Sequence, residues 1–200
     1  MSQPIEFYFD FSSPYGYIAS EKIDAIAARY GREVRWHPFL LGVAHKVTGG
    51  RAPIGVALKD AYYKNDFERS ARFHGVPYRL PSKFPIASLA PTRAFFWLEA
   101  KDAARAKALA KALYRAFFVE DVDISAAENV AGVCAKLGLR ADEVLAALND
   151  PVLKERTKAG VDGAVARGVF GSPHFIVDGE HFWGADRLDQ LERWLATGGF

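Results

Sequence analysis

The feature that most constrains the fold is the order of two hydrophobic patterns along the chain. Near the N-terminus, apolar side chains alternate in "IEFYFDF", from Ile5 to Phe11, with the period of a β-strand. The next segment carries apolar residues at helical spacing, and a second alternating segment covers 33–37. A strand, a helix and a strand in this order favour a parallel pair with a right-handed crossover.

The first helix has a clear start and end in the sequence. Ser13 precedes Pro14, a pair typical of a helix N-cap and the first helical residue. An apolar stripe then runs from Ala19 to Tyr30, and Gly31 is placed to end the helix. We therefore expect one helix across this segment.

The segment from Phe39 to about Gly168 is mostly helical in pattern. Its expected elements are bounded by glycine, proline or capping residues. They are a glycine-rich loop over 40–55, helices over 56–75 and around 106–117, a helix that begins at the capping box Ser125-Ala126-Ala127-Glu128 and ends at Gly138, and a helix that begins at Asp150-Pro151.

Strands return near the C-terminus. Residues 174–177 and 180–183 flank Asp178-Gly179, a two-residue turn typical of a β-hairpin, and an apolar helical stripe follows. We therefore expect a single thioredoxin-like α/β domain over 1–200. Its β-α-β and β-β-α halves would enclose a helical insertion at about 39–168.

Composition narrows the class of partner. The chain has 200 residues, of which 50% are hydrophobic, which is enough for a sizeable core. Its net charge is +2 and no basic run stands out, so nucleic acid is not an expected partner. No segment has the pattern of a signal peptide or a membrane span. We expect a cytoplasmic protein, and the charge balance is compatible with a small anionic ligand without implying one.

Cysteine and histidine usage argues against redox and metal chemistry within the chain. The single cysteine, Cys134, lies on an apolar helical stripe and cannot form an intrachain disulfide, which excludes a self-contained disulfide oxidase. His174 and His181 flank the hairpin, but simple strand pairing places Ile176 opposite His181. We therefore expect no metal site.

Ser13 is the first candidate site residue, and it has two interpretations. As a helix N-cap it contributes about 1 kcal/mol of stability. As a functional group it stands at a helix N-terminus, whose free N–H groups and positive dipole end stabilise an anion and lower the pKa of a nearby thiol. The hydroxyl can donate a hydrogen bond to such a thiolate, whose sulfur must come from a ligand.

The second candidate segment is "GVFGSPHFIVDGEHFWGADR", which covers 168–187. Pro173 is either an ordinary trans proline or a cis proline that exposes the Ser172 backbone to an extended peptide. Asp186 either caps the last helix or accepts the ammonium group of a ligand, beside N–H groups that bind the adjacent carboxylate.

Taken together, these segments resemble the 2-hydroxychromene-2-carboxylate isomerase family, which is related to kappa-class glutathione transferases and DsbA-like thioredoxin folds. The resemblance covers nearly the whole chain. "FYFDFSSPYGYIA" resembles the family's opening motif with its catalytic serine, which corresponds to Ser13. "GVFGSPHFIVDG" resembles the cis-proline segment and "FWGADRLDQLERWL" the closing motif.

The resemblance implies a glutathione site, a homodimer and an aromatic carboxylate substrate. Ser13 would stabilise the glutathione thiolate, which adds transiently to a conjugated carbon as a cyclic hemiketal opens to trans-o-hydroxybenzylidenepyruvate. The backbone of Ser172 would pair with the cysteinyl unit. The γ-glutamyl end would be bound by Trp183, Gly184, Ala185 and Asp186.

The residues expected near the substrate depart from the family pattern. Gly50 and Ala87 stand where relatives often carry asparagine, which leaves the substrate open. His45, Lys46 and Phe84 are candidate substrate contacts, although His45 and Lys46 also fit a solvent-exposed loop. Two other functions stay open: a kappa-like transferase or peroxidase that consumes glutathione, and a non-catalytic thioredoxin-fold binding module.

Overall fold

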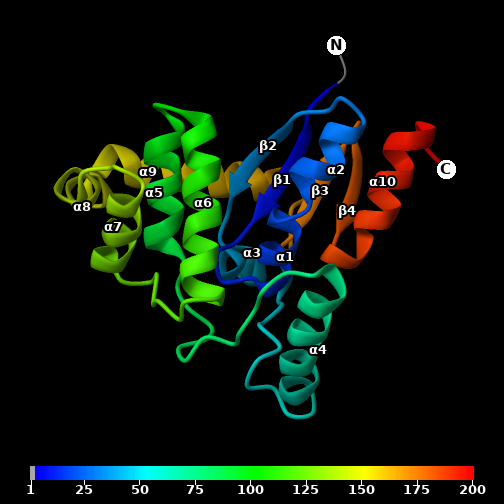
Figure 1. Cartoon of the computed structure of the whole chain (residues 1–200), viewed down its shortest axis with the longest axis horizontal. Helices are drawn as coiled ribbons and strands as arrows, with labels where there is room; N and C mark the ends of the chain where they lie inside the picture. The colour runs from blue at the N-terminus through cyan, green and yellow to red at the C-terminus, as the bar shows by residue number, and fades with distance from the viewer. Residues whose placement is uncertain (1–2) are drawn as a thin grey trace.

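The computed structural model describes residues 3–200 and has a mixed β-sheet at its centre (Figure 1). The strand order is β2-β1-β3-β4. The strands are β1 (Ile5–Phe9), β2 (Val34–Pro38), β3 (His174–Val177) and β4 (Glu180–Trp183). β1 pairs with β2 in parallel, while β3 runs antiparallel to both β1 and β4. The two ends of the chain therefore build one sheet, as the sequence predicts.

Helices cover the sheet and extend away from it. Between β1 and β2 lie α1 (Pro14–Ser20) and α2 (Ile23–Arg29), and after β4 come the short helix η1 (Ala185–Arg187) and α10 (Leu188–Thr197). The helices between β2 and β3 are α3 (Leu41–Thr48), α4 (Lys59–His74), α5 (Leu89–Glu99), α6 (Ala103–Phe118), α7 (Ala127–Lys136), α8 (Ala141–Asn149) and α9 (Pro151–Ala166). In Figure 1, α5 to α8 gather on one side of the sheet, and α4 projects from the body.

Apolar side chains pack against both faces of the sheet because successive strand residues point to opposite sides. On one face, the ring of Phe9 lies 5.7 Å from Phe95 of α5 and 5.8 Å from Tyr114 of α6. On the other face, Tyr8 packs in a smaller cluster with Ala44 of α3 and residues of α9. The sheet is thus a middle layer between helices.

The prediction of one long helix after Ser13 is wrong. The helix stops at Ser20 and restarts at Ile23. The Ser20 hydroxyl donates a 2.6 Å hydrogen bond back to the carbonyl of Tyr17. Such side-chain bonds to the preceding turn compete with the helical ladder. Gly31 has a φ of 61°, as expected for a residue that ends a helix.

The prediction of a loop over 40–55 is also wrong, because the first half of that segment is α3. Leu40, the N-cap residue of α3, makes no side-chain cap bond. The cap comes instead from Asp10, whose Oδ2 accepts the N–H of Leu41 at 2.7 Å. The start signal of α3 therefore lies 31 residues earlier in the sequence.

Of the two expected caps inside the insertion, one is confirmed. Asp150 accepts the N–H of Val152 at 2.8 Å at the start of α9. The capping box at Ser125 is wrong, because this side chain turns back to Asp123 and the N-cap of α7 makes no side-chain bond.

The hairpin and the lone cysteine are as predicted. Asp178 and Gly179 have φ values of 53° and 90°, which suit a two-residue hairpin turn. Cys134 is buried in α7, and burial raises the pKa of its thiol to about 11. Within residues 3–200, no helix is both long and apolar enough to cross a membrane.

Candidate functional site

The N-terminus of α1 meets the segment before β3 through Ser13. The Ser13 hydroxyl accepts the N–H of Gly16 at 3.0 Å, which confirms the N-cap. The same hydroxyl donates to the carbonyl of Ser172 at 2.8 Å. Ser13 is only 4% exposed. The capping interpretation is therefore confirmed, and the role of Ser13 toward a thiolate stays a prediction.

Asp10 ties this junction to α3. Its N–H donates to Ser172 Oγ at 2.9 Å, and its carboxylate accepts the N–H groups of Ser12 and Leu41, each at 2.7 Å. Burial raises the pKa of Asp10, while its bonds to Ser88 and to these amides act in the opposite direction. Sequence reasoning missed Asp10, whose partners lie at scattered positions in the chain.

The close approach of α1 to Ser172 depends on Gly16. A Cβ atom at Gly16 would lie 2.7 Å from Ser172 Oγ and 2.8 Å from the hydroxyl oxygen of Tyr114. The Tyr114 hydroxyl donates to the carbonyl of Asp10 at 2.9 Å. We refer to Asp10, Ser13, Gly16, Tyr114 and Ser172 as the floor of the site. The Ser172–Pro173 peptide bond is cis, which is the isomer that the family resemblance implies.

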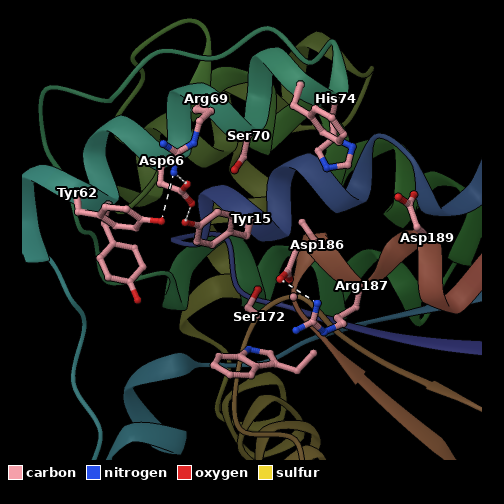
Figure 2. Close-up of a pocket in the computed structure, with 15 residues that line it drawn as sticks. Tyr15, Tyr62, Asp66, Arg69, Ser70, His74, Ser172, Asp186, Arg187 and Asp189 are labelled. Atoms are coloured by element: carbon pink, nitrogen blue, oxygen red, sulfur yellow. Dashed lines mark hydrogen bonds and ion pairs between the residues drawn. The ribbon is translucent and has the colours of Figure 1, made fainter.

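A cavity of about 770 Å³ lies above Ser172 (Figure 2). One side is formed by α4, from Tyr62 to His74, together with Tyr15 of α1. The opposite side is formed by 183–189. Ser172 lines the cavity directly, whereas Ser13 is not among its lining residues and lies behind Ser172, joined to it by the 2.8 Å hydrogen bond.

The 183–189 side contains the residues predicted to bind a γ-glutamyl group. Trp183 is 55% exposed. Its indole packs directly against Gly171, where an added Cβ atom would lie only 2.0 Å from the indole Nε1. Gly184 has a φ of 113°, in the region that favours glycine. Ala185 is buried. The four residues predicted to bind the γ-glutamyl end therefore all line the same side of the cavity.

Asp186 does not cap the last helix, so that interpretation is wrong. It lies within η1, and α10 begins after Arg187 without a side-chain cap bond. The Asp186 side chain is 72% exposed and contacts Arg187 Nη1 at 3.2 Å. Its carboxylate is therefore available on the cavity side for a cationic ligand group.

The opposite side was missed by sequence reasoning. Tyr15 donates a hydrogen bond to Asp66 Oδ2, and Asp66 Oδ1 pairs with Arg69. Arg69 Nη2 also lies 3.2 Å from the hydroxyl of Tyr62. Burial, and then Asp66, raise the pKa of Tyr15 well above its usual value, so it stays protonated. We refer to the cavity-lining residues of α4 as the α4 wall; this set is Tyr62, Tyr63, Asp66, Arg69, Ser70, Phe73 and His74.

The three predicted substrate contacts do not line this cavity. His45 and Lys46 lie on α3, and the electrostatic contribution of His45 slightly offsets the raised pKa of the buried Asp10 carboxyl. Phe84 is half-buried, with its ring 5.9 Å from Phe67 and about as close to aromatic residues of α6. Their assignment to the substrate stays a prediction.

Two histidine side chains of the hairpin are in contact although they are not paired directly opposite each other across the strands. His174 is opposite Trp183 and His181 is opposite Ile176, yet His174 Nε2 lies 2.9 Å from His181 Nδ1. Burial, and then His181, lower the pKa of His174 to about 4. Among the described residues 3–200, no three potential ligands are grouped as a metal site.

Comparisons with known proteins agree with this arrangement. The family model of the DsbA-like thioredoxin domain matches residues 4–196. The chain is 31% identical to a 2-hydroxychromene-2-carboxylate isomerase of Sphingobium xenophagum, covering 98% of this chain and 99% of the relative. It is 27% identical to glutathione S-transferase kappa 2 of Caenorhabditis elegans, over 96% of this chain and 91% of that one.

A solved structure shows the same fold. The crystallised 2-hydroxychromene-2-carboxylate isomerase superposes with a TM-score of 0.88 at 28% sequence identity. The match covers 97% of this chain and 95% of the solved one. The overall fold of this chain is thus that of a known architecture.

Proposed function

The chain belongs to the DsbA-like thioredoxin domain family, in the group of the 2-hydroxychromene-2-carboxylate isomerases, and on this premise we propose that it is a glutathione-dependent isomerase. Its proposed substrate is 2-hydroxychromene-2-carboxylate or a related aromatic carboxylate. The observation that carries the proposal is the Ser13–Ser172 hydrogen bond at the base of the cavity. It joins an anion-stabilising helix N-terminus to a backbone segment that can pair with a peptide.

The residues around the cavity fit glutathione. Asp186 offers an exposed carboxylate for the ammonium group of the γ-glutamyl unit. Trp183 offers an exposed indole face beside it. The backbone of Ser172 lies between this side and α1 and would pair with the cysteinyl unit. A volume of about 770 Å³ also leaves room for a second small molecule.

When bound, glutathione would supply a thiolate, the nucleophile that this chain lacks. The chain's contribution is to hold the negative charge at the start of α1. The Ser13 hydroxyl now donates to the Ser172 carbonyl. A backbone N–H of a paired peptide ligand can replace it as the donor to that carbonyl. The hydroxyl is then free to donate to the sulfur, which lowers the thiol pKa.

The α4 wall suits an aromatic acid. Tyr62 and Tyr63 stand edge to face, with ring centroids 5.7 Å apart, and Phe73 is 79% exposed. Arg69 provides a guanidinium group half open to solvent, which can face a carboxylate. We propose that glutathione occupies the 183–189 side and the aromatic substrate the α4 wall.

Ser13→Ala tests the proposed role of the floor. The variant should lose about 1 kcal/mol of stability through the lost cap. The pKa of bound glutathione, followed by thiolate absorbance, should rise by one unit or more, and turnover at neutral pH should fall about tenfold for each unit. Turnover should recover partly at higher pH. Equal titration curves and equal turnover in the two proteins would reduce Ser13 to a helix cap.

The kappa-class relative favours a second candidate, a transferase that consumes glutathione. Product analysis separates the two activities, because an isomerase returns free glutathione while a transferase converts it stoichiometrically. Absence of glutathione binding by calorimetry would favour a non-catalytic module. The homodimer and the cytoplasmic location stay predictions, which light scattering and cell fractionation test.

A further inference from the structure

One carboxylate of the cavity is held differently from the others. The Asp66 side chain is 19% exposed, compared with 72% for Asp186. Asp66 Oδ2 accepts the hydroxyl of Tyr15, and Oδ1 pairs with Arg69. A carboxylate has about four lone-pair sites, so Asp66 can accept one more hydrogen bond from a molecule in the cavity.

The hydrogen bond between Tyr15 and Asp66 joins α1 to α4. Tyr15 follows Ser13 by two residues in the first turn of α1, while Asp66 lies on α4. Figure 2 shows the Tyr15 side chain between Asp66 and Ser172. A phenol and a carboxylate therefore meet within the cavity, close to the floor where the sulfur would lie.

Under the proposed function, on which this inference rests, the reaction must move a proton. The substrate is a cyclic hemiketal. To open its ring, the hemiketal hydroxyl loses its proton and becomes the ketone oxygen. The bond between that carbon and the ring oxygen breaks, and the electron pair goes to the ring oxygen. This oxygen takes up a proton and becomes a phenol, so one proton leaves one oxygen as another is gained.

We propose that Asp66 and Tyr15 are the catalytic pair that carries this proton. Asp66 accepts the proton of the hemiketal hydroxyl, and Tyr15 donates its own proton to the ring oxygen as the C–O bond breaks. The proton on Asp66 then passes to the Tyr15 oxygen along the hydrogen bond that joins them. Both side chains return to their starting state without any further reactant.

Other titratable groups of the cavity are less suited to this step. His74 lies eight residues after Asp66 on α4, which is about 12 Å along the helix at 1.5 Å per residue. Asp189 lies on α10, beyond η1. Neither is hydrogen-bonded to a phenol. Asp66 is also the carboxylate that Arg69 keeps in place, so its geometry is set before a ligand binds.

The test compares Tyr15→Phe and Asp66→Ala with wild type on 2-hydroxychromene-2-carboxylate. Each variant should lower kcat by about 10²-fold, the usual contribution of a general acid or base, with KM changed less than threefold. Glutathione affinity and the thiolate absorbance should stay within twofold of wild type. Added formate should restore part of kcat in Asp66→Ala, because it replaces the missing carboxylate, and should not affect Tyr15→Phe.

The matched controls are Tyr30→Phe, which removes a hydroxyl at the end of α2, and Asp142→Asn, which removes a charge on α8. Both should keep wild-type kcat. Tyr15→Phe retains the ring that packs 5.2 Å from Phe67, so its fold is preserved. Wild-type kcat in both site variants, or loss of kcat in Asp66→Ala without rescue by formate, overturns the proton role. Failure of wild type itself to open the chromene overturns the proposed function, and this inference with it.

Discussion

The floor, which reaches the cavity through Ser172, and the α4 wall, which lines the cavity, are built in opposite ways. In the floor, Asp10, Ser13 and Ser172 are buried, and their hydrogen bonds connect residues up to 162 positions apart. In the α4 wall, Tyr62 and Phe73 are 56% and 79% exposed. The only buried residues of α4 are Phe67 and Ala71.

This difference separates the two tasks of the site. Buried, mutually bonded groups hold one geometry, and loss of a single partner leaves others unsatisfied. A helix with few buried contacts opens locally at low free energy. The floor is thus suited to fixing the position of a thiolate, and the α4 wall to admitting substrates of different shape.

The largest effect expected from this comparison is on stability when a carboxylate is removed from each region. Asp10→Ala leaves the amides of Ser12 and Leu41 without their acceptor, and each such loss costs about 1–3 kcal/mol. We expect a total near 3–5 kcal/mol by urea denaturation. Asp66→Ala, in the α4 wall, should cost about 1 kcal/mol or less. Equal losses would erase the distinction between the two regions.

The second expected effect is acid sensitivity next to the floor. His174 follows Pro173, and its pKa is lowered to about 4, so the folded protein resists protonation that the unfolded chain accepts near 6.5. The stability that the neutral imidazole contributes is fully present above pH 6.5. It is lost as the pH falls from 6.5 towards 4, because only the unfolded chain takes up the proton in that range. A fall of the pKa from 6.5 to about 4 should cost about 3 kcal/mol, at about 1.4 kcal/mol per pKa unit. His174→Leu should show a flatter profile over the same range; an unchanged slope would contradict the assignment.

A smaller effect is expected from a methyl group. In Gly16→Ala, the new Cβ meets Ser172 Oγ and the Tyr114 hydroxyl, both already hydrogen-bonded, and should destabilise the protein by about 1–3 kcal/mol. Gly163 of α9 has nothing within 4 Å of its added Cβ. Gly163→Ala should therefore stabilise by about 0.5–1 kcal/mol. Thermal unfolding of both variants gives the signs, and the same sign in both would count against a close-packed floor.

The smallest effect is expected at the outer end of the α4 wall. Phe73 is 79% exposed, so Phe73→Ser should change stability by less than about 0.5 kcal/mol. The same variant should weaken binding of the aromatic substrate, because Phe73 lines the cavity. Substrate KM and the melting temperature, measured together, separate the two effects. A large drop in melting temperature would show that this wall is packed like the floor.

Features set by neighbouring residues could be predicted from the sequence. The Asp178-Gly179 hairpin, the Ser13-Pro14 cap and the Asp150 cap each depend on side chains within a few positions of the backbone groups they bind. Trp183, Gly184 and Ala185 were predicted from the family resemblance of the closing motif, and Asp186 also from its position before the last helix.

Features set by distant partners could not be predicted in this way. The sequence predicts a loop at α3 because the carboxylate that caps this helix belongs to Asp10, which directly follows β1. The sequence predicts a helix over 56–75 but no site residue on it, because the hydrogen bond that links this helix to α1 joins Tyr15 to Asp66 across 51 residues. No periodicity in the sequence marks such pairs, which depend on how the elements pack.

The buried cysteine has a practical consequence for work on this protein. Cys134 is enclosed in α7 and its pKa is raised to about 11, so it is almost entirely an unreactive thiol at neutral pH. Thiolate absorbance and the reaction with alkylating reagents therefore have almost no background from the folded chain. Any such signal that appears on adding glutathione comes from the ligand. Its excess over the signal of the same concentration of free glutathione reports the bound fraction, without a label on the protein.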